Sequence, residues 1–240
     1  MAQDSKLIFP EISWGIKATL FAVLISITVP IIASIGLGYI LSNIANFLPD
    51  YQRAQVYVLF MSFITQVVML GSVWFVAMHK KQAKVNSLGI KKPEIYLLLK
   101  FVLVGILLTL LVPVVYGLGR AIFGVENLQP STLPEAITEN QGSLLIFGFM
   151  AICIAPVVEE IFFRGFVYPS IANRYGVIIS AVATSFLFGL AHIVAANAII
   201  AFFIGLILVY VYHQTTNLLT PIVVHSVFNL ISVIIIMVSL

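Results

Sequence analysis

Apolar runs that are too long for a water-soluble core recur along this chain, and they limit its fold more than any other feature. They occupy residues 16–41, 54–78, 95–123 and much of the chain after Ser143. An α-helix needs about 20 apolar residues to cross the hydrocarbon core of a bilayer. Hydrophobic residues make up 61% of the chain and charged residues only 9%, unlike a soluble globular domain. The sequence therefore predicts an all-α, polytopic transmembrane helical bundle of about seven spans.

The spans that follow Ser143 are shorter and closely spaced. We expect the fourth to begin near that residue, and the fifth, sixth and seventh to cover 177–192, 197–212 and 218–240. The only cysteine, Cys153, lies in the fourth apolar run, which excludes an internal disulfide and predicts a buried thiol. The sequence has no evident internal repeat, which argues against a transporter built from two inverted halves.

A lysine-rich loop between the second and third spans sets the expected orientation. It holds five lysines and no acidic residue between His79 and Pro93, whereas the loop 124–141 holds three glutamates and no lysine or arginine. Basic residues concentrate in the cytoplasmic loops of membrane proteins. We therefore expect the N-terminus and the lysine loop in the cytoplasm and the C-terminus outside. The same rule accounts for the pI near 9.0, so we expect no nucleic-acid partner.

Two carboxylates and a guanidinium interrupt the apolar fourth span. Each ionised group near the bilayer centre costs about 2.5 to 3.5 kcal/mol. On a helix Glu160 and Arg164 stand four residues apart and can form an ion pair along one face, whereas Glu159 is rotated by about 100°. The spacing gives the pair a structural role and leaves Glu159 as the candidate reactive group. A purely structural alternative also stands, in which Glu159 only accepts a hydrogen bond from a neighbouring span.

Two further polar pairs occur in the later spans. Phe188 and His192 are four residues apart, as are His225 and Asn229, so each pair is predicted to share one helix face. A lone histidine in a helix is usually a satisfied core residue. The coincidence of both pairs with Glu159 is what favours a functional interpretation.

The predicted depth of these residues brings them together. We place the turn between the fourth and fifth spans at 173–176, so that Glu159 lies fourteen residues before it and His192 sixteen residues after it. At 1.5 Å per residue both positions lie roughly 21 to 24 Å from the turn, provided that Pro169 does not break the helix. His225 follows the last loop closely enough to reach a comparable level.

A carboxylate and an imidazole at one level can activate water by general base catalysis. A second histidine with an amide can donate hydrogen bonds to a tetrahedral oxyanion, an interaction worth roughly 3 to 4 kcal/mol per donor. No serine lies beside the histidines in a recognisable nucleophile motif. The sequence thus favours hydrolytic acyl transfer, most simply the cleavage of a peptide bond.

The order of these motifs resembles a known family. Glu159-Glu160-x-x-x-Arg164, Phe188-x-x-x-His192 and His225-x-x-x-Asn229 on successive spans are similar to the CAAX protease and bacteriocin-processing family of intramembrane glutamate proteases, also called the Abi family. The similarity covers 143–240. It implies a catalytic core there and an N-terminal three-span region at 1–142.

The resemblance also implies a role for each site residue. Glu159 would be the catalytic glutamate, acting with His192 to activate water. His225 and Asn229 would form the oxyanion site. The supporting residues would be Glu160, Arg164 and Phe188.

The resemblance further implies a setting for the reaction. The cavity would open to the cytoplasm, with no cofactor and no metal, in what we expect to be a prokaryotic plasma membrane. Eukaryotic members remove the last three residues of prenylated proteins, whereas prokaryotic members are associated with processing peptide pheromones or bacteriocins and with self-immunity. The expected partners are the bilayer and a membrane-associated peptide or protein substrate, with or without a lipid anchor. The oligomeric state stays open.

Three other functions remain alongside a metal-free protease. Glu159, His192 and His225 would be adequate zinc ligands in a metal hydrolase, although the chain has no HExxH motif. A non-catalytic membrane immunity or scaffold protein would need only the fold. A transporter or channel would use the intramembrane charges as a proton relay.

Overall fold

The predicted all-α fold is confirmed. The computed structural model describes residues 12–123, 135–192 and 195–239, and these ranges are helical with no strand. Two apolar helices of intermediate length, Ile95–Leu107 and Val177–Leu190, accompany longer ones. Five helices are long and apolar enough to cross a membrane: Ile16–Asn43, Asp50–Lys80, Gln141–Tyr175, Ala198–Thr215 and Leu219–Val238. The chain is therefore an integral, multi-pass membrane protein.

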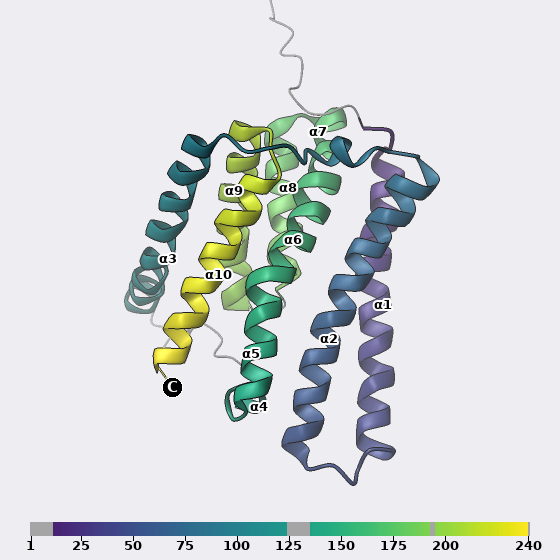
Figure 1. The fold of residues 1–240 in the computed structure, drawn as a ribbon, viewed down its shortest axis with the longest axis vertical. Helices are drawn as coiled ribbons and strands as arrows, with labels where there is room; N and C mark the ends of the chain where they lie inside the picture. Colours follow the sequence, from purple (N-terminus) through teal and green to yellow (C-terminus); the bar gives the residue numbers. More distant parts are fainter. Residues whose placement is uncertain (1–11, 124–134, 193–194, 240) are drawn as a thin grey trace, which may run out of the picture.

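The first two spans form an antiparallel pair at one side of the bundle (Figure 1). They are α1 (Ile16–Asn43) and α2 (Asp50–Val73), and a π-helical turn, η1 (Trp74–Lys80), continues α2. Hydroxyl groups join the two helices within the apolar region, since Ser34 and Tyr57 approach to 2.5 Å. Most large apolar side chains of α1 are exposed, as expected of a helix that faces lipid.

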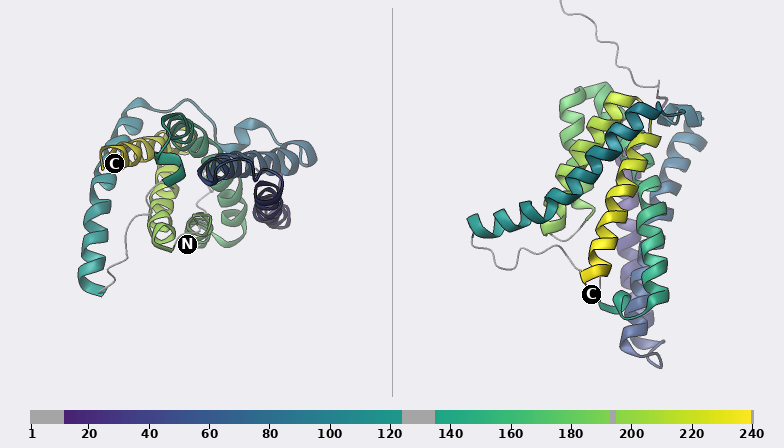
Figure 2. Two further views of the ribbon diagram at one scale, coloured as in Figure 1. Left: turned by 90° about the horizontal axis from the view of Figure 1, so that it is seen from below. Right: turned by 60° about the vertical axis from the view of Figure 1, so that its left-hand side comes forward.

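The lysine loop crosses one end of the bundle, between the first pair and α3 (Ile95–Phe123) (Figure 1). It contains a short 3-10 turn, η2 (Val85–Leu88), whose Leu88 is buried. A Cβ atom on Gly165 would lie 3.2 Å from the Leu88 carbonyl oxygen, so the glycine permits the close approach of loop and bundle. The third span, α3, packs against α10 at this end and leans away from the bundle toward its own C-terminal end (Figure 2).

The fourth span is one continuous helix of 35 residues that contains two π-helical segments. It follows the short helix α4 (Glu135–Thr138). Neither Pro156 nor Pro169 ends the helix, as the depth argument required. π-Helical segments are rare and often lie at functional sites. In chain order its parts are α5 (Gln141–Phe149), η3 (Met150–Ile154), α6 (Ala155–Glu160), η4 (Ile161–Val167) and α7 (Tyr168–Tyr175).

The last three helices return across the bundle three times. Gly176, with a φ of 85°, makes the turn into α8 (Val177–Leu190) and lies within the predicted turn region. The helices α9 (Ala195–Thr215) and α10 (Leu219–Ser239) follow. The predicted fifth span was two residues too long, because α8 ends at Leu190 and His192 lies in the turn beyond it.

The packed core lies around η4, at the end of the bundle that carries the lysine loop. The indole of Trp14 stacks on Phe166 and donates to its carbonyl oxygen at 3.1 Å. Thr19 donates to the Ser170 hydroxyl at 2.7 Å. These contacts attach the N-terminal region to the fourth span, while the proposed boundary between 1–142 and 143–240 stays a prediction. The prediction that Cys153 is a buried thiol was wrong, since this residue is exposed on the outer side of the helix.

Candidate functional site

The predicted ion pair forms, and it is completely buried. An Arg164 Nη1 atom lies 2.7 Å from Glu160 Oε1, and both side chains have no exposed surface. The second guanidinium nitrogen, Nη2, donates to the carbonyl oxygen of Gly205 at 3.1 Å. A buried charge requires such a partner because desolvation is costly. The pair therefore ties the fourth span to α9.

An aromatic side chain covers the ion pair. Phe188 is 1% exposed, and its ring centroid lies 4.5 Å from the guanidinium carbon of Arg164, within the range of a cation–π interaction. Phe163 meets the same ring edge-on at 5.2 Å. Phe188 thus lies beside the charged cluster.

His225 connects the two glutamates. Its Nδ1 atom lies 3.0 Å from Glu160 Oε1, the same oxygen that accepts from Arg164. Its Nε2 atom lies 3.9 Å from Glu159 Oε2. Because the paired carboxylate is an acceptor, Nδ1 carries a proton and donates to it. One imidazole is consequently held by Glu160 on one side and faces Glu159 on the other.

Glu159 is the more accessible of the two carboxylates. Its side chain is 16% exposed, whereas that of Glu160 is fully buried. The 3.9 Å separation from His225 Nε2 is too long for a direct hydrogen bond. A separation of this size suits two groups that share a small polar molecule or a developing charge between them.

His192 lies at the turn after α8 and not on its helical face. Its Nδ1 atom is 2.8 Å from the Phe188 carbonyl oxygen, and its ring lies 4.8 Å from the Phe188 ring. Phe188 also meets the His225 ring at 5.7 Å, so the two imidazoles contact one phenyl ring. Within the described part of the chain, no hydrogen bond or ion pair joins His192 to Glu159. The predicted partnership of these two residues stays a prediction.

Asn229 binds the fourth span. Its Nδ2 atom donates to the carbonyl oxygen of Ala151 at 2.7 Å, within η3. An amide group has two N–H donors, so one remains for another acceptor. The side chain is half-buried, and it anchors α10 beside the helix that carries the glutamates.

The candidate site is thus a cluster of seven residues from three helices and one turn. Sequence spacing named all seven as candidates. The Glu160–Arg164 pair is confirmed, whereas the roles of the seven residues in a site stay predictions. Spacing missed the hydrogen bond between Glu160 and His225, which joins residues 65 positions apart. It also missed Gly205 and Ala151, because a backbone carbonyl gives no signal in the sequence. Across the described ranges, no three His, Cys, Asp or Glu side chains lie close enough together to hold a metal ion.

Comparison with known proteins gives one match. Residues 141–231 match the family model described as type II CAAX prenyl endopeptidase Rce1-like. The matched segment contains the whole cluster, from Glu159 to Asn229. No curated protein and no solved structure shows significant similarity to the chain.

Proposed function

We propose that the chain, whose residues 141–231 match the Rce1-like CAAX prenyl endopeptidase model, is an intramembrane endopeptidase working through a glutamate-activated water. The substrate would be a membrane-associated peptide or protein, with or without a lipid anchor. The observation that carries the mechanism is the position of His225 between a buried, paired carboxylate and a partly exposed one.

We assign the first step to Glu159. Its carboxylate would accept a proton from water, and the resulting hydroxide would attack the carbonyl carbon of the peptide bond. His192 is placed to assist, because its Nδ1 is engaged by the Phe188 carbonyl and its Nε2 remains for the water. The Glu159 carboxylic acid would then return the proton to the leaving amine as the carbon–nitrogen bond breaks.

The tetrahedral intermediate needs donors for its oxyanion. His225 would supply Nε2–H while its Nδ1–H stays on Glu160, so that the carboxylate offsets the charge of the imidazolium. The second N–H of Asn229 would supply the other hydrogen bond. In this assignment Glu160 and Arg164 orient His225 and do not touch the substrate.

The test compares peptides from cells that express the native protein with those from cells that express Glu159→Gln. Gln keeps the shape of Glu159 but cannot accept the proton. Glu139→Gln is the matched control, since Glu139 is exposed and lies outside the cluster. The melting temperatures of the purified native protein, Glu159→Gln and Glu139→Gln are compared to verify that all three are equally folded.

If the protein is a protease, some peptide termini are absent from cells that express Glu159→Gln but present with the native protein and the Glu139→Gln control. The same termini reappear when the purified native enzyme is added to the precursor. Identical peptide profiles, together with a cellular phenotype that Glu159→Gln still supports, would instead identify an immunity or scaffold protein.

A further inference from the structure

A polar pocket lies at the lysine-loop end of the bundle, away from the glutamates. Its volume is about 150 Å³. Three segments form it: Lys91 and Lys92 from the loop, Leu97 from the first turns of α3, and Thr215–Asn217 from the turn between α9 and α10. The pocket is therefore a junction at which the loop, α3 and α10 meet.

The turn that forms its floor is specifically shaped. Thr216 has a φ of 47°, in the left-handed region that β-branched residues avoid. Two residues further on, the N–H of Leu218 donates to the Gly89 carbonyl oxygen at 2.8 Å and fixes the turn to the lysine loop. Unfavourable backbone conformations persist where surrounding contacts require them, often at ligand sites.

A buried amide group offers donors to the pocket. Asn217 is 4% exposed and lines it, and its Oδ1 accepts from the N–H of Leu219 at 2.9 Å. Its Nδ2 atom has no hydrogen-bond partner among the residues that the structure describes. An amide N–H that lines a pocket and has no protein partner can donate to a ligand with acceptor oxygens.

The charge of the pocket selects an anion. Lys91 and Lys92 contribute two positive charges against the single negative charge of Glu94. Glu94 also begins α3, since its carbonyl oxygen accepts from the N–H of Leu98 at 2.9 Å. The first N–H groups of a helix lack intrahelical partners and add positive potential. A phosphate group, with several acceptor oxygens, matches this set of donors.

The surroundings favour a phosphate that carries an apolar tail. Ile95 and Tyr96, beside the pocket, are 68% and 73% exposed, as expected of residues that face lipid. Deeper along the same seam, α3, α9 and α10 enclose a second pocket of only about 20 Å³, too small for an acyl chain. It is lined by Gly105, Ile204, Ile207, Leu208, Val224, His225 and Phe228. Gly105 follows Leu97 by eight residues, which places this second pocket about 12 Å further into the bundle.

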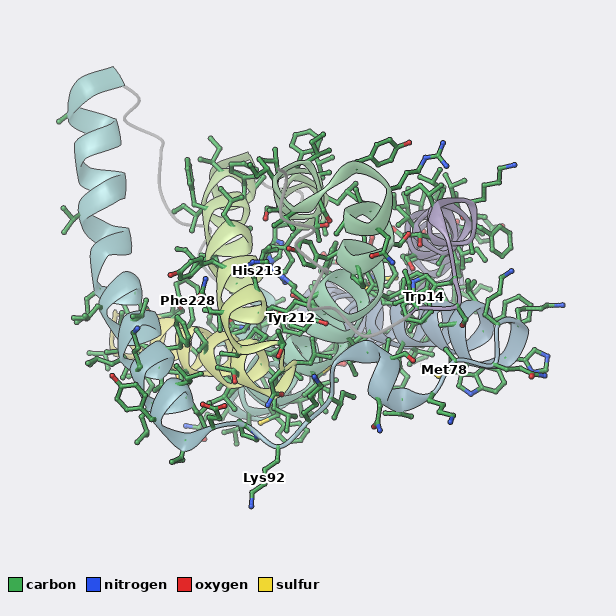
Figure 3. The ribbon with its side chains drawn as sticks, turned by 90° about the horizontal axis from the view of Figure 1, so that it is seen from above. Trp14, Met78, Lys92, Tyr212, His213 and Phe228 are labelled. Atoms are coloured by element: carbon green, nitrogen blue, oxygen red, sulfur yellow. The ribbon has the colours of Figure 1, made fainter. Side chains whose placement is uncertain are left out.

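We propose that the seam between α3 and α10 binds an anionic phospholipid. The phosphate occupies the pocket formed by Lys91, Lys92 and Asn217, and the acyl chains extend into the bilayer past the exposed Ile95 and Tyr96. Lys92 extends from the loop away from the bundle, where its flexible amine can close over a headgroup (Figure 3). Anionic lipids attract basic segments beside membrane spans, which agrees with the expected cytoplasmic side of this loop.

The experiment measures lipid binding to the purified full-length protein by native mass spectrometry from detergent. The probes are phosphatidylglycerol, phosphatidylcholine with the same acyl chains, and inorganic phosphate. The test variant is Lys91→Gln with Lys92→Gln. The control is Lys80→Gln with Lys81→Gln, which removes the same charge from the same loop outside the pocket.

The proposal predicts that phosphatidylglycerol binds more tightly than phosphatidylcholine. The Lys91/Lys92 variant weakens phosphatidylglycerol binding about tenfold, the control variant leaves it nearly unchanged, and Glu94→Gln strengthens it. If both lysine variants weaken phosphatidylglycerol binding equally, the loss comes from general surface charge and the proposal is overturned. Inorganic phosphate that displaces the lipid at similar concentration would identify a soluble phosphate as the ligand and overturn the lipid assignment.

Discussion

Replacing Arg164 by alanine would leave a carboxylate buried without its partner. Glu160 has no exposed surface. Among the residues that the structure describes, Arg164 at 2.7 Å is its only cationic partner apart from the His225 imidazole, which is charged only when protonated. Removal of one member of a buried ion pair costs about 3 to 5 kcal/mol, because the remaining charge is desolvated and uncompensated. The same change deletes the hydrogen bond to Gly205 and the cation–π contact with Phe188. We expect the upper half of that range.

The effect is large enough for a thermal measurement. For proteins of this size, each kcal/mol lowers the melting temperature by about 2 to 4 °C, so Arg164→Ala lowers it by roughly 8 to 20 °C. The assay follows unfolding in detergent by intrinsic tryptophan fluorescence. Arg174→Ala is the matched control, because that arginine lies on the same helix, is exposed and contacts only its neighbour Tyr175. Exposed substitutions of this kind change stability by about 0.5 kcal/mol or less.

A second variant isolates the physical cause. If the unpaired charge is responsible, adding Glu160→Gln to Arg164→Ala recovers part of the lost stability, since the glutamine is neutral and still accepts from His225. Equal melting temperatures for Arg164→Ala and Arg174→Ala would refute the assignment of a structural role to the pair. A double variant less stable than Arg164→Ala alone would show that packing, and not charge, dominates.

Three further predictions concern other parts of the bundle. Gly205→Ala lowers stability by about 1 to 3 kcal/mol, because the Cβ of the new alanine would lie 3.0 Å from the Cβ of Ser185. The control is Gly71→Ala: no atom lies within 4 Å of the added Cβ, so the melting temperature stays unchanged or rises. In a double-mutant cycle measured by thermal unfolding, Thr19→Val and Ser170→Ala show a coupling of about 0.5 to 1.5 kcal/mol from their hydrogen bond; additive effects would contradict it. Exhaustive chelation leaves peptide cleavage undiminished and elemental analysis finds no metal, whereas loss of cleavage that zinc restores would support the metal hydrolase.

Local spacing predicted the contacts that are local in the chain. The Glu160–Arg164 pair follows from four-residue spacing on a helix, and the turn at Gly176 follows from a polar break between apolar runs. The continuity of the fourth span through Pro169, on which the depth estimate depends, is confirmed, whereas the common depth of Glu159 and His192 stays a prediction.

Spacing could not supply the rotation and tilt of one helix relative to another. The hydrogen bond from His225 to Glu160 depends on which face of α10 meets the fourth span, and that choice is made by packing. The end of α8 before His192 is likewise a matter of the turn that joins it to α9. The prediction of a buried Cys153 was wrong for the same reason. A transmembrane helix is apolar all round, so its sequence does not show which side faces the bundle.

The π-helical segments affect which single-residue insertions and deletions the fourth span can tolerate. Each such segment accommodates extra chain within a helix, so the loss of one residue from η3 or η4 can be absorbed by a return to ordinary α-helical winding. The loss of one residue inside α6, before the glutamates, would instead rotate both of them by about 100° relative to the part of the span that precedes them. Single-residue gaps among relatives should therefore gather in 150–154 and 161–167 and avoid 155–160. The two glutamates would then lie on a segment of fixed length between two segments that tolerate single-residue changes in length.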